Sequence, residues 1–95
     1  MEISTSSNVV TITGSIKTVG DFQSIKSCID SLKVSHKSIK IIISDSISIT
    51  SSVIGYLNRL VLKDKIDLSM KVANKNLIEL FEDLHLSKVF KIEKI

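Results

Sequence analysis

The chain is poor in the residues on which disulfides, metal centres and phosphate loops depend. Its 95 residues include one cysteine, two histidines and three glycines. The single Cys28 excludes an internal disulfide and fits a reducing cytoplasm, and its place in an apolar helical pattern predicts a small core residue. The histidines, Cys28 and the acidic residues have no metal-site spacing, and the isolated glycines form no phosphate-binding loop. We therefore expect neither a metal nor a cofactor.

Aromatic residues and arginine are also scarce. One tyrosine, three phenylalanines and no tryptophan predict an aliphatic core with little aromatic surface for a large planar cofactor. Arg59 is the only arginine, and the lysines that give the net charge of +3 are scattered along the chain. This pattern lacks the interleaved basic and aromatic residues that are typical of nucleic-acid binding. We therefore expect no nucleic-acid partner.

No apolar run approaches the roughly 20 residues that a membrane-spanning helix needs. The sequence also shows no signal peptide and no amphipathic helix whose lysines gather on one face. These observations predict a cytoplasmic protein that does not insert into a membrane.

Signatures of catalysis are missing as well. Ser51 and Ser52 are the serines considered as nucleophiles, but no G-x-S-x-G elbow surrounds them. His85, near the end of a predicted helix, is better explained as a cation at a helix C-terminus than as a general base. Because a serine nucleophile needs a base and an oxyanion site, we expect a protein without catalytic activity.

Hydrophobic periodicity divides the chain into alternating strands and helices. Thr18 with Asp21, and Asn76 with Glu79, match the capping arrangement of a helix N-terminus, and Asn74 is the alternative cap for the last helix. The predicted strands are 2–5, 9–13, 39–43 and 67–73, with a short last strand as an option in the closing segment 86–92. The predicted helices follow Thr18, cover 51–63 and follow Asn74 or Asn76. Crossover connections require the later strands to be parallel, while the first strand can pair antiparallel. We expect one α/β domain over residues 1–95, with a mixed, mostly parallel sheet of four or five strands and three or more helices packed on it.

The most informative stretch runs from Ile39 to Leu62. Residues 40–43 are a β-branched run of the kind that fills a strand buried on both faces. An apolar stripe of helical spacing begins at Val53, so residues 50–52, a threonine and two serines, lie where a helix starts. The first N–H groups of a helix lack partners and carry the positive end of its dipole. A hydroxyl there can cap the helix, and a phosphate there would be held by the same N–H groups; both interpretations stay open.

The residues at this helix start resemble the signature of the STAS domain family. The segment Thr50-Ser51-Ser52-Val53-Ile54-Gly55-Tyr56-Leu57 is similar to the Asp-Ser-Ser-Gly-Leu-Gly motif and following helix of the anti-sigma-factor antagonists in that family. Ile12-Thr13-Gly14-Ser15-Ile16 resembles the family's strand that ends in Gly-Glu-Leu. Residues 68–74, with the leucines and phenylalanine of residues 84–90, resemble its last strand and helix. The resemblance covers nearly the whole chain and implies a STAS-like domain.

The resemblance implies a role for each residue of the motif. Ser51 matches the serine that a kinase phosphorylates in many family members, and Ser52 matches the neighbouring hydroxyl, so both are candidate phosphorylation sites. Thr50 stands where the family has an aspartate that is thought to assist phosphotransfer. Val53 stands where the family has a glycine that lets a partner approach the backbone. Asp45 and Asp21 are the candidates for a carboxylate that takes the place of the aspartate missing at position 50.

The function implied by the resemblance is that of a bacterial anti-sigma-factor antagonist. Such a protein is a non-catalytic module of signal transduction and transcription regulation that switches partners, and its expected partner is an anti-sigma factor of the serine-kinase type. Two alternatives stay open: a small cytoplasmic STAS subunit that docks on the ATPase of a lipid-transporting ABC transporter, and a constitutive assembly domain in a signalling complex. The residues predicted to contact the partner lie on the second helix and just before it: Ser46, Ser48, Thr50, Tyr56, Asn58, Arg59 and Lys63.

Overall fold

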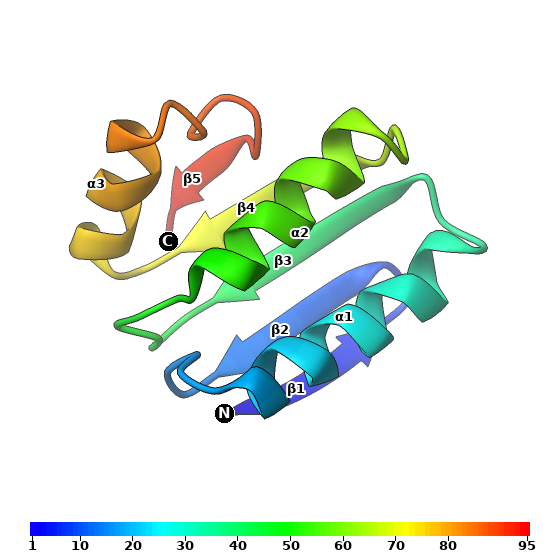
Figure 1. Cartoon of the computed structure of the whole chain (residues 1–95), viewed down its shortest axis with the longest axis horizontal. Helices are drawn as coiled ribbons and strands as arrows, with labels where there is room; N and C mark the ends of the chain where they lie inside the picture. Colours follow the sequence, from blue (N-terminus) through cyan, green and yellow to red (C-terminus); the bar gives the residue numbers. More distant parts are fainter.

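Strands and helices follow one another in the predicted order. The computed structural model describes all 95 residues. It contains the strands β1 (Glu2–Ser6), β2 (Val9–Thr13), β3 (Ser38–Ile43), β4 (Asp67–Val72) and β5 (Ile92–Lys94) and the helices α1 (Val19–Lys33), α2 (Ser51–Leu62) and α3 (Lys75–Asp83). The strands form one sheet in the order β1-β2-β3-β4-β5, in which β1 is antiparallel to β2 and every other pair is parallel (Figure 1). The predicted α/β fold with a mixed, mostly parallel sheet is confirmed.

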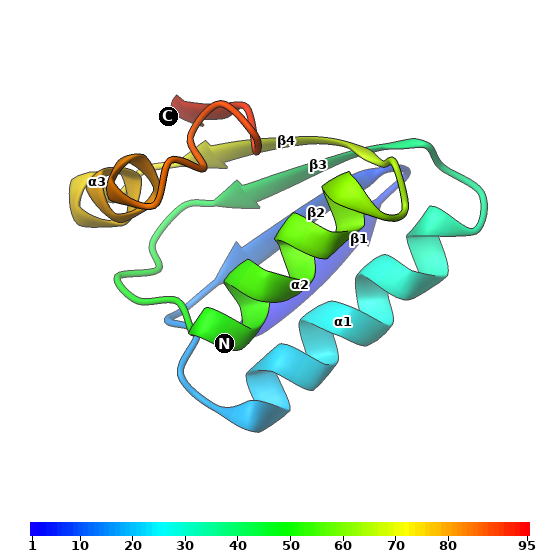
Figure 2. The ribbon, with the colours of Figure 1, turned by 45° about the horizontal axis from the view of Figure 1, so that its top comes forward.

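The sheet has one face covered by helices and one open face. α1 and α2 lie side by side on the covered face, and no helix lies on the other (Figure 2). Side chains alternate accordingly along β3: Ile39, Ile41 and Ile43 are buried, whereas Lys40 and Ile42 are partly exposed. The prediction that this strand is buried on both faces is wrong, because the β-branched run has a helix layer on one side only.

α3 closes the C-terminal end of the core. Its Leu77 and Phe81 are buried, and the ring of Phe81 packs edge-on against Phe90, with ring centroids 5.7 Å apart. Since Phe90 lies in the turn that leads into β5, this contact joins α3 to the segment before the last strand. The rest of the core is mainly aliphatic. Cys28 is half-buried on α1, and burial raises the pKa of its thiol, as expected of a packed and unreactive side chain.

The helix ends show which polar residues act as caps. Thr18 caps α1 and forms the predicted capping box with Asp21, each side chain accepting from the backbone N–H of the other residue. Asn74 caps α3 and accepts from the Leu77 N–H at 3.1 Å. Asn76 lies inside that helix, so the alternative of an Asn76 cap is wrong. None of the three helices combines the length and the apolar composition that crossing a bilayer would require.

Candidate functional site at the start of α2

α2 begins at Ser51, and Thr50 is its N-cap. Thr50 has extended backbone angles, φ −91° and ψ 154°, and its hydroxyl accepts a hydrogen bond from the Val53 N–H at 3.4 Å. Ser51 and Ser52 are the first two helical residues, and both are exposed. Because Thr50 serves as the cap, the Ser51 hydroxyl is free of that role and lies in solvent beside the unpaired N–H groups of the first turn.

The loop before α2 is tied to the loop after β2. Ser46 donates its hydroxyl to the Gly14 carbonyl, and the Asp45 carboxylate accepts from the Gly14 N–H at 2.8 Å. The Ile16 N–H donates to the Ser48 carbonyl at 3.3 Å, and the Ser48 hydroxyl donates to the Ile16 carbonyl at 3.2 Å. Gly14 has φ +80°, a left-handed conformation that favours glycine. These contacts fix the position at which α2 begins.

Two loop serines that were predicted to contact a partner, Ser46 and Ser48, form hydrogen bonds to the loop after β2. Ser46 is only 1% exposed, so the prediction that it lies on the surface is wrong. The cause is its bond to Gly14, 32 residues earlier in the chain, which no local pattern reveals. Ser48 is half-buried by the same pairing of loops. Between them, the apolar side chain of Ile47 is 66% exposed.

A hollow of about 270 Å³ lies between the N-terminal ends of α1 and α2, which Figure 1 shows at the same end of the molecule. Its lining consists of Lys17, Thr18, Val19, Phe22, Thr50 and Ser52. Val19 is 73% exposed, so the mouth of the hollow has a hydrophobic rim. The contribution of α1 was not predicted. Val19 itself was the available signal, since it is an apolar residue outside the buried stripe of its helix.

Tyr56, predicted to be on the partner-binding surface, is buried. It is 5% exposed, its hydroxyl donates to the Asp30 carboxylate of α1, and its ring packs edge-on against Phe22 with centroids 6.2 Å apart. The Lys26 ammonium lies 5.8 Å from the ring centroid. The predicted exposure is wrong because position 56 falls on the same helical stripe as Val53, which faces the core. Tyr56 instead joins α2 to α1.

The bond between Tyr56 and Asp30 depends on pH. The hydrogen bond from Tyr56, followed by that from Lys26, lowers the pKa of Asp30 from 3.8 to about 2. Burial, followed by the hydrogen bond to Asp30, raises the pKa of the Tyr56 hydroxyl, which therefore stays protonated as the donor. A carboxylate whose pKa is lowered by folding stabilises the native state above its unfolded pKa, and that stabilisation is lost as the pH falls through the folded pKa.

We therefore expect the free energy of unfolding to decrease as the pH falls from 3.8 to about 2, and to decrease less steeply in Tyr56→Phe. The phenylalanine keeps the ring contact with Phe22 but removes the first cause of the lowered pKa. Urea unfolding at a series of pH values measures both slopes. Identical slopes for the two proteins would show that this hydrogen bond does not contribute to the pH dependence.

The exposed side of α2 carries Gly55, Arg59 and, at the C-cap, Lys63, while Asn58 is half-buried. The contact of Asn58, Arg59 and Lys63 with a partner stays a prediction.

A Cβ atom at Gly55 would meet no other atom within 4 Å. Glycine inside a helix costs about 0.5–1 kcal/mol relative to alanine, so the fold alone gives no reason for a glycine at this position.

Gly55→Ala is expected to raise the free energy of unfolding by about 0.5–1 kcal/mol, because alanine has the higher helix propensity and the site has room for it. Equilibrium unfolding in urea, compared with the unmodified chain at the same pH, measures the difference. A lower stability would mean that position 55 is packed or conformationally constrained.

Both candidates for a replacement carboxylate are engaged with backbone. The Asp21 carboxylate accepts from the N–H groups of Lys17 at 2.9 Å and Thr18 at 3.1 Å, and these two bonds hold the pKa of Asp21 below its ordinary value. Asp45 accepts from the Gly14 N–H, and α2 has no acidic residue in its first turn. The two carboxylates thus stabilise the loops beside the site.

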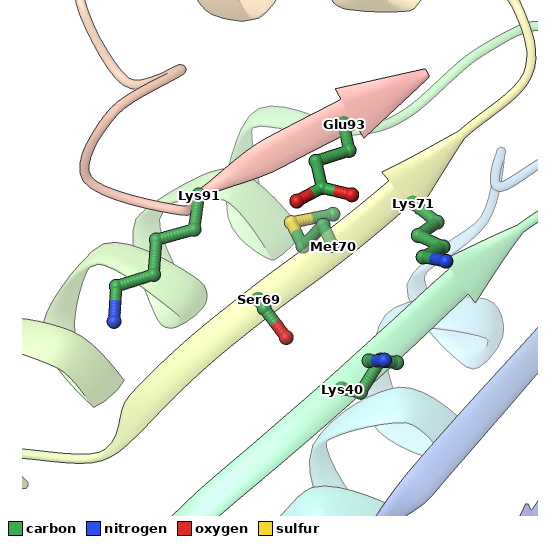
Figure 3. A pocket seen from close by; sticks show the side chains of 6 residues that line it. All are labelled: Lys40, Ser69, Met70, Lys71, Lys91 and Glu93. Atoms are coloured by element: carbon green, nitrogen blue, oxygen red, sulfur yellow. The ribbon is translucent and has the colours of Figure 1, made fainter. Parts of the chain in front are cut away.

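A second hollow, of about 100 Å³, lies near the β5 edge of the sheet, away from the start of α2. Figure 3 shows the six residues that line it: Lys40, Ser69, Met70, Lys71, Lys91 and Glu93. None of the residues predicted for function belongs to it. Elsewhere, no three histidine, cysteine or carboxylate side chains lie close enough together to share a metal ion.

Comparison with known proteins adds no assignment to this site. No family model and no curated protein matches the chain. A function for the start of α2 is therefore inferred from its residues and geometry, together with the resemblance of residues 50–57 to the STAS signature.

Proposed function

We propose that this chain is a non-catalytic regulatory module that binds a protein partner at the start of α2 and releases it when Ser51 is phosphorylated. One observation carries the proposal: Ser51 is exposed at the first helical position while Thr50 supplies the cap. A hydroxyl in this position is accessible to a kinase. Its modification removes no hydrogen bond from the folded chain, because the cap bond belongs to Thr50.

A phosphate on Ser51 is compatible with the folded state. It adds about −1.5 to −2 charges, and the unpaired N–H groups and positive dipole end of α2 favour an anion there. No acidic residue of the first turn opposes it, and Lys17 lines the adjoining hollow. Phosphorylation would therefore alter the surface and leave the fold intact.

The surface around Ser51 suits a partner that inserts an apolar side chain. Val19 and Phe22 give the hollow an apolar wall, and Ile47 is exposed on the adjoining loop. Gly55, one turn after Ser51, leaves room for the partner's backbone. A partner docked here would lose affinity on phosphorylation, because a phosphate in an apolar interface is costly to desolvate. A coupling of about 1–3 kcal/mol changes affinity about 5- to 150-fold.

The resemblance to the STAS signature supports a partner class. In the anti-sigma-factor antagonists, the serine that matches Ser51 is phosphorylated by a kinase-type anti-sigma factor. We infer a bacterial, cytoplasmic partner of that type for this chain, with Ser52 as the neighbouring phosphorylation candidate. Arg59 and Lys63 would extend the contact along the exposed side of α2.

One observation favours a second candidate function. Thr50 replaces the family's aspartate, and the carboxylates of Asp45 and Asp21 both accept backbone hydrogen bonds. Without a free carboxylate to assist phosphotransfer, the same surface would act as a constitutive binder. The chain would then be an assembly domain or the small STAS subunit of a lipid-transporting ABC transporter, docked on its ATPase.

Capture from a lysate of the source cells separates these functions. The unmodified chain, Ser51→Asp and Ser51→Ala are each immobilised, and captured proteins are identified by mass spectrometry. A kinase-type protein captured by the unmodified chain and Ser51→Ala, but not by Ser51→Asp, supports the phosphorylation switch. An ATPase of a transporter captured by all three supports the constitutive function. Ser35→Asp, in the exposed turn after α1, controls for added charge.

A further inference from the structure

β1 is an outer strand with an unprotected edge. Its only neighbour in the sheet is β2, so one row of its backbone N–H and C=O groups has no partner strand. It is five residues long, its Glu2, Ser4, Thr5 and Ser6 are exposed, and it contains neither proline nor lysine. The opposite edge, β5, has only three residues, two of which are charged. An edge strand is usually protected from pairing by being very short or by carrying charged side chains. β1 is longer than β5, and Glu2 is its only charged residue.

We propose that two copies of this chain associate through their β1 edges, antiparallel and around a two-fold axis at Ser4. The two sheets then become one continuous sheet, because each unpaired edge supplies the backbone hydrogen bonds that the other needs. The occupant is a second copy because the strand is complementary to itself. Glu2 lies opposite Ser6 of the second copy, Ile3 opposite its Thr5, and Ser4 opposite its Ser4. No like charges face each other, and hydroxyl pairs across strands are favourable.

The side of α1 nearest this edge is also suited to a second copy. Phe22 and Asp30 contact Tyr56 of α2, and Ile25 and Ile29 are buried against the sheet. By the 3.6-residue period, the side of α1 away from α2, over β1, carries no lysine and consists of Asp21, Ser24, Cys28 and Ser31. Figure 1 shows α1 as the outermost helix, beside β1. The second copy can therefore approach without opposing lysines.

This pairing is independent of the proposed partner site. In the helix layer α1 lies beside β1, whereas α2 lies further from this edge, over β3 (Figure 1), and the exposed residues of α2 take no part in the contact. The dimer would therefore present two copies of the Ser51 surface, whichever partner binds there.

Sedimentation equilibrium of the full chain over a range of concentrations tests the proposal. We expect the mass to rise with concentration toward twice the 10.5 kDa of one chain. Ser4→Lys and Ser4→Glu should each raise the dissociation constant at least about tenfold, since each places like charges opposite each other in the interface. An equimolar mixture of the two variants should associate again, because lysine then faces glutamate. Asn76→Lys adds the same charge at an exposed position on α3, which packs on β4 and β5 at the other side of the sheet, and should behave like the unmodified chain.

Three results would overturn the proposal. One is an unmodified chain that keeps the mass of a single copy up to about 1 mM, a concentration that detects even weak association. Another is equal weakening by Ser4→Lys and Asn76→Lys, which would indicate general charge repulsion. The third is a mixture of Ser4→Lys and Ser4→Glu that does not reassociate, since the two-fold axis at Ser4 requires that it does. Circular dichroism of each variant verifies that it is folded.

Discussion

Replacing Ser51 by aspartate is expected to weaken partner binding at least about fivefold, the lower end of the range for a coupling of 1–3 kcal/mol. The added carboxylate must lose its water in the interface at the start of α2, where the neighbouring residues Thr50 and Ser52 line the hollow. The free energy of unfolding should stay the same or rise by about 0.3–1 kcal/mol, because an acidic residue in the first turn of a helix is favourable. Weaker binding together with undiminished stability cannot arise from damage to the fold.

Titration calorimetry with the captured partner measures this effect, and urea unfolding of the same preparations measures stability. Ser35→Asp carries the same new charge in the turn after α1 and should bind like the unmodified chain. Equal affinities for Ser51→Asp, Ser51→Ala and the unmodified chain would mean that residue 51 does not control binding. A stability loss in Ser51→Asp would mean that the serine has a structural role.

Leu60→Ala is expected to lower the free energy of unfolding by about 2–5 kcal/mol, because it leaves a cavity beneath α2. Leu60 is fully buried, whereas Leu62 on the same helix is 57% exposed. Leu62→Ala should therefore change the stability by no more than about 0.5 kcal/mol. The two variants carry the same substitution, leucine to alanine, on the same helix. The difference between their losses of stability therefore shows which side of α2 faces the core.

Chemical denaturation of both variants decides this prediction. The result also bears on the candidate site, because the helical register that buries Leu60 is the one that turns Ser51, Gly55 and Arg59 to solvent. Similar losses of stability for the two variants would mean that α2 is rotated about its axis relative to the structure. The exposed surface assigned to the partner would then be the wrong one.

The fold was predictable because its signals are local. Each helix has a stripe of apolar residues and a polar cap, and Thr18 with Asp21 forms the box that their spacing predicts. The start of α2 was equally predictable, since the apolar stripe begins at Val53, but the sequence left the cap open between Thr50 and Ser51, and the structure shows that Thr50 is the cap. Such patterns depend on neighbours within one or two helical turns.

The parts of the site that were not predicted depend on tertiary contacts. Ser46 is buried by a loop that is 32 residues distant in sequence. Tyr56 lies on the apolar stripe of α2, but the partner that its buried hydroxyl needs, Asp30, is on α1. A tyrosine on a helix can lie at an interface or in the core, because it has an apolar ring and a polar hydroxyl. The hollow beside Ser52 needs α1 and α2 together, and a single segment of sequence cannot reveal it.

The most direct measurement is to locate phosphate on the chain after incubation with a lysate of the source cells and ATP. Peptide mass spectrometry of the recovered protein should find the phosphate on Ser51, and the recovered protein should no longer retain the partner that the unmodified chain binds. Phosphate confined to residues far from α2, or no phosphate while the partner stays bound in the presence of ATP, would contradict a switch at Ser51.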